Sequence, residues 1–558
     1  MSTLDWAVLV GTIGAIVAYG VWKTRGAQNA GAYLRGGSDA KWWTIGLSIM
    51  ATQASAITFL STPGQGFEDG LGFVQFYFGV PIAMVVLSAT IVPIYYRTRV
   101  LTAYEYLEQR FDLKTRQLTA LIFLLQRGLG AGLSIYAPAI ILSTVLGWSL
   151  MWTNLVIGVV VIAYTVSGGT RAVNQTQQLQ MAVMLGGMAL AFVFIVSSLP
   201  EAVSVRDAFG LAGAFGKLKA IDFTPRLETR YTFWSGITGG TFVALAYFGT
   251  DQSQVQRYLS GESLEQSRWG LLFNGLLKVP MQLLILLVGV FVFVSFQFQA
   301  PPVFFNAPEL ETVRASPRAA ELSVLEQKHQ TLFAQKRALI DTWLAQHDDA
   351  TVTQLRVLET EARTVRADTR KLVKDVSPRA NVKDADYVFL TFVMTRFPPG
   401  LVGLLLAVIL CAAMSATASA LNALGTTTVV DFYKRTWNPK ASDVDSVRAG
   451  KVFTVMWGVV AMVFAAFASQ VDNLIQAVNI LGSIFYGPML GVFLVGFFFK
   501  AARGTPVFIA VALAQAVVIV TWLASDIGFL WYNVIGCAGV ALFTAVLDKV
   551  MPKPTVSA

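Results

Sequence analysis

The sequence predicts an all-α integral membrane protein with about 13 transmembrane helices and one polar helical hairpin inserted outside the membrane. Of its 558 residues, 55% are hydrophobic and only 13% are charged, and the mean hydropathy is +0.59. Soluble proteins carry about 25% charged residues, so this composition excludes a soluble globular chain. Apolar stretches of roughly 20 residues, enough to cross a bilayer core as a helix, recur from end to end.

Basic residues in the connecting loops predict the orientation of the chain. Lys and Arg concentrate in every second loop, for example at Arg97, Lys114 and Lys434, and such loops face the cytoplasm. We therefore expect a cell-membrane protein, in an inner or plasma membrane, with its N-terminus outside and its C-terminus in the cytoplasm. The same bias explains the net charge of +9 without a nucleic-acid partner. The expected spans are 4–22, 42–61, 73–96, 117–146, 150–166, 178–198, 233–251, 268–297, 399–423, 450–469, 477–499, 505–523 and 527–547.

Residues 299–386 are too polar to lie in the membrane and form an insert on the outer side. Apolar residues recur there at helical 3-4 spacing in two runs, one from Leu322 to Trp343 and one from Leu355 to Leu372. Asp348-Asp349 between the runs is a plausible turn, so we predict an antiparallel helical hairpin. It is either a solvated appendage or a surface through which a protein partner or a second copy docks.

The predicted spans contain almost no acidic residue and no histidine. Asp251 and Asp431 are expected near cytoplasmic helix ends. Proton relays in transporters use Asp, Glu or His, and metal sites need softer ligands than hydroxyls, so both are disfavoured. A Ser–His catalytic pair is excluded for the same reason, and we predict no enzyme activity. Hydroxyl and backbone oxygens remain, and these suit a hard monovalent cation.

The second expected span has the composition of a broken helix. Small and polar residues fill its centre from Ala51 to Thr58, and Pro63-Gly64 follows. Unwound helices of this kind supply carbonyl oxygens to ions in transporters. Ser415 and Ser419 in the ninth span lie four residues apart, hence on one helix face. The alternative for both spans is tight helix packing through small residues.

These motifs resemble the sodium:solute symporter family over nearly the whole chain except the insert. The resemblance is carried by the run 51–58 with Pro63-Gly64, by Tyr164-Thr165-Val166-Ser167-Gly168-Gly169, by the run 249–257 and by the ninth span with Asp431-Phe432-Tyr433-Lys434. The family implies a leucine-transporter-type core of two inverted five-helix repeats. The implied organisation is an extra helix and cytoplasmic loop at 1–41, a first repeat at 42–198, an external loop and the start of the second repeat at 199–298, the insert at 299–386, the rest of the second repeat at 387–469, and C-terminal helices at 470–558.

The resemblance implies a sodium ion as the coupling ion, with no organic cofactor and no other metal. Carried over by position, its ligands are the carbonyls of Ala51, Ala54 and Ala412 and the hydroxyl of Ser415. Two departures weaken the site. Ala416 stands where relatives carry a second hydroxyl, and Gln177 stands where some relatives have the aspartate of a further sodium site that also uses Ser419. We therefore expect at most one sodium per cycle, and loss of coupling stays open.

The substrate pocket is expected among residues of several spans. Arg127 and Lys278 lie deep in spans with no evident acidic partner, and intramembrane charge is costly. Each either attracts an anionic group of the substrate or snorkels to the cytoplasmic surface. The architecture of the family adds further candidates, namely Gln53, Ser55, Thr58, Tyr77, Ser134, Tyr136, Tyr247 and Phe248. The positions that contact sugars in sugar-transporting relatives mostly differ here, which favours a small carboxylate or an amino acid.

The sequence thus favours a secondary active transporter that carries a small anionic or zwitterionic solute by alternating access, driven by sodium. A transporter-like membrane sensor is the alternative from another class. A channel is less favoured because no filter-like repeat occurs.

Overall fold

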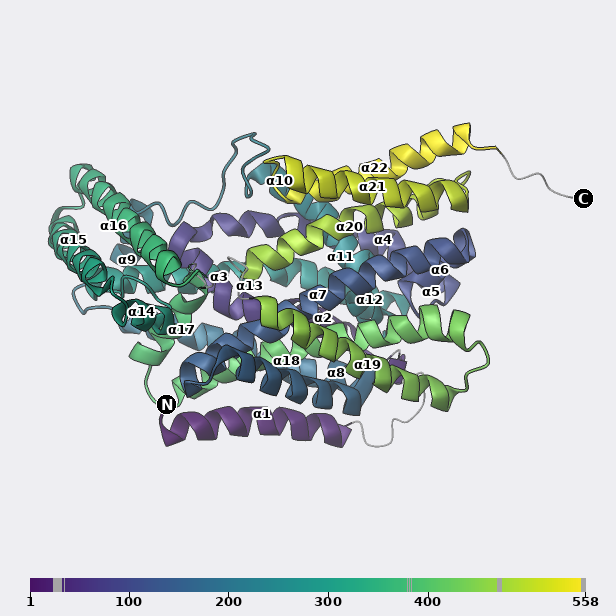
Figure 1. Ribbon diagram of the computed structural model, residues 1–558, viewed down its shortest axis with the longest axis horizontal. Helices are drawn as coiled ribbons and strands as arrows, with labels where there is room; N and C mark the ends of the chain where they lie inside the picture. The colour runs from purple at the N-terminus through teal and green to yellow at the C-terminus, as the bar shows by residue number, and fades with distance from the viewer. Residues whose placement is uncertain are drawn as a thin grey trace, which may run out of the picture.

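The computed structural model describes residues 1–23, 33–34, 36–378, 380, 382, 384–468 and 474–552, and these form helices with no strand among them. Figure 1 shows an elongated bundle whose helices run mostly along its long axis. The helices α15 and α16 project at one end, where α1 also begins, and the last residues of α22 lie at the other. The all-α prediction is confirmed.

The helix bounds in the first half of the described chain are α1 Thr3–Lys23, α2 Trp42–Gln53, α3 Ala56–Asp69, a 3-10 helix Gly70–Tyr77, α4 Gly79–Ala89, α5 Ile91–Thr98, α6 Ala103–Arg110, α7 Leu113–Leu146, α8 Leu150–Ser197, α9 Val205–Ala214, α10 Phe233–Ile237, α11 Gly239–Thr250 and α12 Gln252–Leu259. The second half contains α13 Leu264–Phe298, α14 Ala307–Arg314, α15 Ala319–Gln346, α16 Asp349–Val376, α17 Ala385–Arg396, α18 Leu401–Thr427, a π-helix Thr428–Trp437, α19 Asp443–Phe467, α20 Leu474–Phe498, α21 Gly504–Ala524 and α22 Leu530–Val550.

Ten helical segments of the described chain are long and apolar enough to cross a membrane, compared with the 13 spans we expected. The difference arises where helices are interrupted or short. The apolar run Ala56–Thr98 counts once although it covers parts of two expected spans, α11 has 12 residues, and the first part of α8, Leu150–Val166, is below the length limit. The figure of 13 stays a prediction.

Two helices are broken in the middle of the bundle. Between α2 and α3 the backbone leaves the helical region at Ala54 (φ −81°, ψ 83°) and at Ser55 (φ −82°, ψ 172°). The predicted break is therefore present, although Pro63 lies inside α3 and not at the break. A second break, which we did not predict, separates α11 from α12 at Asp251 (φ −79°, ψ 118°), whose carboxylate accepts the Ser253 N–H at 2.9 Å.

A seam of glycines brings α3 into backbone contact with its neighbours on one side. A Cβ atom on Gly64 would collide with the carbonyl oxygen of Ala385 in α17. One on Gly289 in α13 would collide with the carbonyl oxygen of Pro63, and one on Gly66 with that of Leu286. Only glycine allows this approach, so α3, α13 and α17 interlock through main-chain atoms.

The insert is an antiparallel pair of helices, as predicted. Two ion pairs join the helices. Arg318 pairs with Asp375 at 2.9 Å at the end of the hairpin away from the turn, and Lys336 pairs with Glu359 at 2.9 Å closer to the turn. The turn consists of His347 and Asp348, one residue earlier than we expected. Asp348 caps α16 by accepting the Thr351 N–H at 2.8 Å, so Asp349 is already helical.

The description of the insert as a solvated appendage is wrong, because the hairpin packs on the bundle. Ile340, Trp343 and Leu355 near its turn belong to the main hydrophobic core. At its other end, Arg370 donates to the carboxylate of Glu68 in α3 at 2.5 Å. Whether a partner or a second copy also contacts the insert stays a prediction.

Candidate functional site

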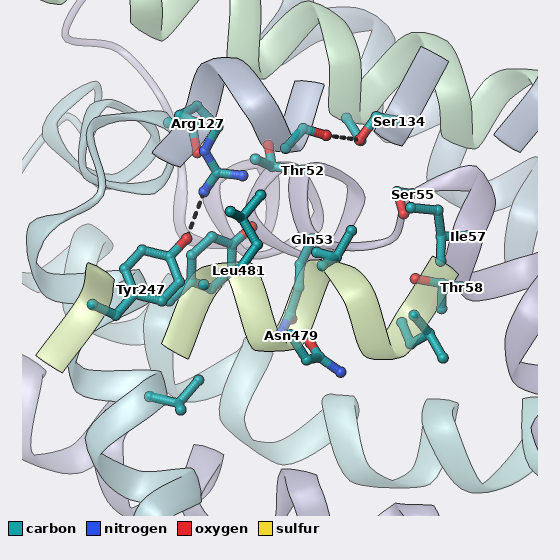
Figure 2. Close-up of a pocket in the computed structure, with 18 of the residues that line it drawn as sticks. Thr52, Gln53, Ser55, Ile57, Thr58, Arg127, Ser134, Tyr247, Asn479 and Leu481 are labelled. Atoms are coloured by element: carbon teal, nitrogen blue, oxygen red, sulfur yellow. Dashed lines mark hydrogen bonds between the residues drawn. The ribbon is translucent and has the colours of Figure 1, made fainter. Parts of the chain in front are cut away.

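A cavity of about 120 Å³ lies where the two helix breaks face each other in the bundle. It is bounded by the break at α2–α3, by α7, α11, α18 and α20, and by the end of the 3-10 helix. Most of the predicted substrate residues line it, and Figure 2 labels six of them around one space, namely Gln53, Ser55, Thr58, Arg127, Ser134 and Tyr247. The full set of predicted residues in the lining is Gln53, Ser55, Thr58, Tyr77, Arg127, Ser134, Tyr247 and Phe248.

Tyr136 and Lys278, two predicted substrate residues, do not line this cavity. Tyr136 follows Ser134 by two positions on α7, which turns it about 200° away from the lining face. Lys278 is fully buried, and its ammonium lies 4.9 Å from the ring centroid of Tyr77. Tyr77 lines the cavity and Lys278 does not, so any effect of Lys278 on a solute would pass through Tyr77.

Arg127 has an acidic partner, contrary to our expectation. Its guanidinium forms an ion pair with the buried carboxylate of Asp251 and donates to the Tyr486 hydroxyl at 3.0 Å. Tyr486 in turn donates to Asp251 at 2.9 Å, and the ring of Tyr247 stacks 5.3 Å from the guanidinium carbon. We placed Asp251 at a cytoplasmic helix end because the second break was not recognised. The break turns its side chain back toward α7.

Amide side chains supply polar groups to the cavity that the sequence only partly indicated. Gln53 was predicted, whereas Gln126 and Asn479 were not. Figure 2 shows the side chains of Gln53 and Asn479 next to each other. Within the described residues, Gln53 Oε1, Gln126 Oε1 and Asn479 Nδ2 have no hydrogen-bond partner, so each is available to a solute. Asn479 was missed because it lies in 470–558, which we assigned to C-terminal helices outside the two repeats.

The predicted cation ligands lie where α2 meets α18. The Ser415 hydroxyl donates to the Ala51 carbonyl at 2.9 Å, so two of the predicted ligands already touch. Ala51, Ala54 and Ala412 are fully buried, and Ala54 lies in the break, where its backbone is free of helical geometry. Oxygens of this type are ligands that a sodium ion takes in transporters, and their role here stays a prediction.

Gln177 occupies the position of the further sodium site. Its amide nitrogen lies 3.0 Å from the Thr52 hydroxyl, 3.0 Å from that of Ser415 and 2.8 Å from that of Ser419. Its amide oxygen accepts from the Ser48 hydroxyl at 2.5 Å. A neutral donor thus contacts the oxygens that a second cation would need, which does not fit a second ion.

Comparisons with known proteins decide the family. The family model described as "Sodium:solute symporter family" matches residues 33–326 and 371–511, well over half of the chain.

The chain belongs to the sodium:solute symporter family.

Among its curated relatives, sodium-coupled monocarboxylate transporter 2 of Bos taurus is 27% identical over 497 residues, which cover 88% of this chain and 67% of that protein. The sodium/sialic acid symporter of Proteus mirabilis is 24% identical over 553 residues, covering 97% and 93%. The solved structure of a substrate-bound, outward-open Na⁺-coupled sialic acid symporter superposes with a TM-score of 0.75 at 22% identity, covering 99% of this chain and 98% of that one.

Family membership confirms several expectations from the sequence. The protein is a multi-pass membrane protein, its fold is that of a symporter, and sodium-coupled transport of a small organic solute is the activity of its family. The roles of the individual site residues stay predictions.

Proposed function

We propose that the protein is a symporter that carries a small organic anion, of the monocarboxylate class, together with one sodium ion. The observation that carries the choice of an anion is the charge of the cavity. Arg127 is the only charged side chain among the described residues that line it, and although it pairs with Asp251, its buried Nε has no hydrogen-bond partner among them. The N-terminus of α3 also opens into it at Ser55, Ile57 and Thr58, and helix N-termini attract anions.

The names of the relatives support the same class of solute. One transports monocarboxylates and another sialic acid, which is also a carboxylate. Of the unpartnered amide atoms, Asn479 Nδ2 can donate to a carboxylate, whereas Gln53 Oε1 and Gln126 Oε1 accept and suit an N–H or O–H group of the solute. A sugar without a charge would offer the free Nε of Arg127 no charged acceptor.

We propose a stoichiometry of one sodium ion per cycle. The ligands are the carbonyls of Ala51, Ala54 and Ala412 and the hydroxyl of Ser415. The amide nitrogen of Gln177 donates hydrogen bonds to the hydroxyl oxygens of Ser415 and Ser419, which supports a single ion because those oxygens would otherwise face a second one. Ser419 is therefore a partner of Gln177 in our proposal and not a sodium ligand.

We also propose that the two inverted repeats span 42–198 and 233–469. In support, each repeat has a broken helix near its start, at Ala54 and at Asp251. The N-terminus and the insert lie at the same end of the bundle, which agrees with our proposal that both are outside and the C-terminus is cytoplasmic.

Uptake by proteoliposomes tests the proposed function. Radiolabelled propionate should accumulate under an inward sodium gradient, with a Hill coefficient for sodium near one, and should exchange with unlabelled propionate when no gradient is applied. Equal uptake with potassium would show that sodium coupling is lost. Binding without any exchange would favour the sensor over the carrier. Glucose should compete weakly, and strong competition by it would contradict the anion.

A further inference from the structure

A second cavity, of about 220 Å³, lies between the insert and the bundle. Its walls come from the end of α3, the end of α13, the segment after it, and the facing sides of α15 and α16. The described residues that line it are Phe67, Glu68, Asp69, Lys217, Phe293, Phe296, Gln297, Pro301, Phe305, His329, Lys336, Glu359, Ala362, Arg363, Arg366 and Arg370.

This cavity is separate from the central one. Phe67 lies nine residues beyond Thr58 on α3, or about 13 Å at 1.5 Å per residue, and the two cavities share no lining residue. The family model leaves residues 327–370 unmatched, and this segment supplies seven of the lining residues, from His329 to Arg370. The cavity is therefore built in part from a segment that lies outside the family pattern.

One wall of the cavity is aromatic. Phe67 stands edge-on to Phe293 and to Phe305 with ring centroids 5.6 Å apart in both pairs, and to Phe296 at 6.1 Å. Side chains in such edge-to-face clusters are held firmly, and they offer a flat or apolar group a preformed surface.

Basic side chains outnumber carboxylates in the lining, and two of them lie over the phenyl rings: the Lys217 ammonium is 4.3 Å from the ring centroid of Phe293, and the Arg366 guanidinium carbon is 5.1 Å from that of Phe305. Five basic side chains line the cavity, namely Lys217, Lys336, Arg363, Arg366 and Arg370, against the three carboxylates of Glu68, Asp69 and Glu359. The buried Asp384 outside the lining pairs with Arg366 and Arg370, which still leaves one basic group in excess.

Donors in this lining are left without partners. Arg366 Nε is buried and has no hydrogen-bond partner among the described residues. The Lys217 ammonium donates to the carbonyls of Phe67 and Glu68, both at 2.6 Å, which uses two of its three protons. Burial and the nearby Arg363 lower the pKa of Lys217 to about 7, so an anion placed beside it would restore its charge.

We propose that this cavity is a second binding site, which takes a small organic anion with one carboxylate on an aromatic or apolar body. The carboxylate meets Arg366, Lys217 and Arg363, and the body lies on the phenylalanine wall. The end of α3 at Phe67 to Asp69 forms part of the site, so an occupant braces the insert against the broken helix.

Benzoate is a suitable probe, and isothermal titration of the full-length protein in lipid nanodiscs measures its binding. The Ala416→Phe variant is used as the background, because a phenylalanine there fills the central cavity and leaves only the second site. We expect benzoate to bind to this background with one site, and Ala362→Trp, which fills the second cavity, to abolish binding. Ala338→Trp, at an exposed position of α15, is the matched control and should leave binding unchanged.

Arg363→Gln provides a test that does not depend on packing. Arg363 is about half exposed, and its loss should weaken benzoate binding at least fivefold without affecting the fold. Lys371→Gln, an exposed cation on the same helix that does not line the cavity, should have no effect. If Ala362→Trp does not fold, the comparison of Arg363→Gln with Lys371→Gln shows whether benzoate binds in the second cavity.

Three results would overturn the proposal. They are no binding to the Ala416→Phe background, binding that Arg363→Gln and Lys371→Gln weaken equally, and binding of chloride as strong as that of benzoate. None of them depends on transport, so a failure of the proposed symport and a failure of this site are distinguishable.

Discussion

Replacing Gln177 by leucine should destabilise the junction of α2, α8 and α18. The side chain is fully buried, its amide oxygen accepts from Ser48, and its amide nitrogen lies within 3.0 Å of the hydroxyls of Thr52, Ser415 and Ser419. The nitrogen carries two protons, so about three hydrogen bonds are lost, which at about 1 kcal/mol each cost about 3 kcal/mol. Thr52 and Ser419 already lie 3.1 Å apart and can still bond to each other, so we expect about 2–3 kcal/mol.

Thermal unfolding in detergent, followed with and without sodium, measures this effect. Gln515→Leu is the matched control, because that side chain donates one hydrogen bond of 3.0 Å, to the Ile484 carbonyl, and its loss should cost about 1 kcal/mol. If Gln177→Leu is no less stable than Gln515→Leu, the amide does not hold the junction and our reasoning is wrong.

Gln177→Asp replaces the neutral, donating amide at this position with a carboxylate that can bind a cation. A buried carboxylate needs a cation, so this variant should be stabilised by sodium more than the original protein. Binding of one additional ion at 100 times its dissociation constant adds about 2.7 kcal/mol. Stabilisation by sodium equal to that of the original protein would show that no second ion enters.

Three further predictions concern other parts of the structure. Ser415→Ala should raise the sodium concentration for half-maximal uptake at least tenfold, and Ala416→Ser should lower it; an unchanged sodium dependence of both would exclude this site. Asp251→Asn leaves the Arg127 guanidinium without its carboxylate and should cost about 3–5 kcal/mol, most of which the double variant with Arg127→Met regains; additive losses in thermal unfolding would contradict the pair. Lys217 titrates near pH 7 when folded and near 10.5 when unfolded, so the unfolded state binds more protons between these values and the free energy of unfolding should rise with pH there. Lys217→Met should flatten this rise, and an unchanged profile would contradict the assignment.

Local chemistry explains which parts of the structure could be predicted. The break at Ala54-Ser55 and the hairpin both follow from short stretches of sequence, through small polar residues in one case and 3-4 spacing in the other. The break at Asp251 has no proline, and the Arg127–Asp251 pair joins positions 124 residues apart, so neither shows in local pattern. Packing also decides which face of a helix lines a cavity, and therefore Tyr136 and Lys278 were placed in it while Asn479 was not.

The glycine seam of α3 has a consequence for how the protein can move. Gly64, Gly66 and Gly289 lock α3 to α13 and α17 through main-chain atoms, and surfaces that interlock in this way cannot slide past each other. The interface at which helices move past α3 during a transport cycle must then be on its opposite side, where α3 contacts α7, α18 and α20. The central cavity lies along that side, and the contact of Ser415 in α18 with Ala51 in α2 lies just before the break that precedes α3. Solute and ion would thus bind at the interface between the parts that move. Binding of either one would then change the rate of the conformational change as well as the populations of its end states.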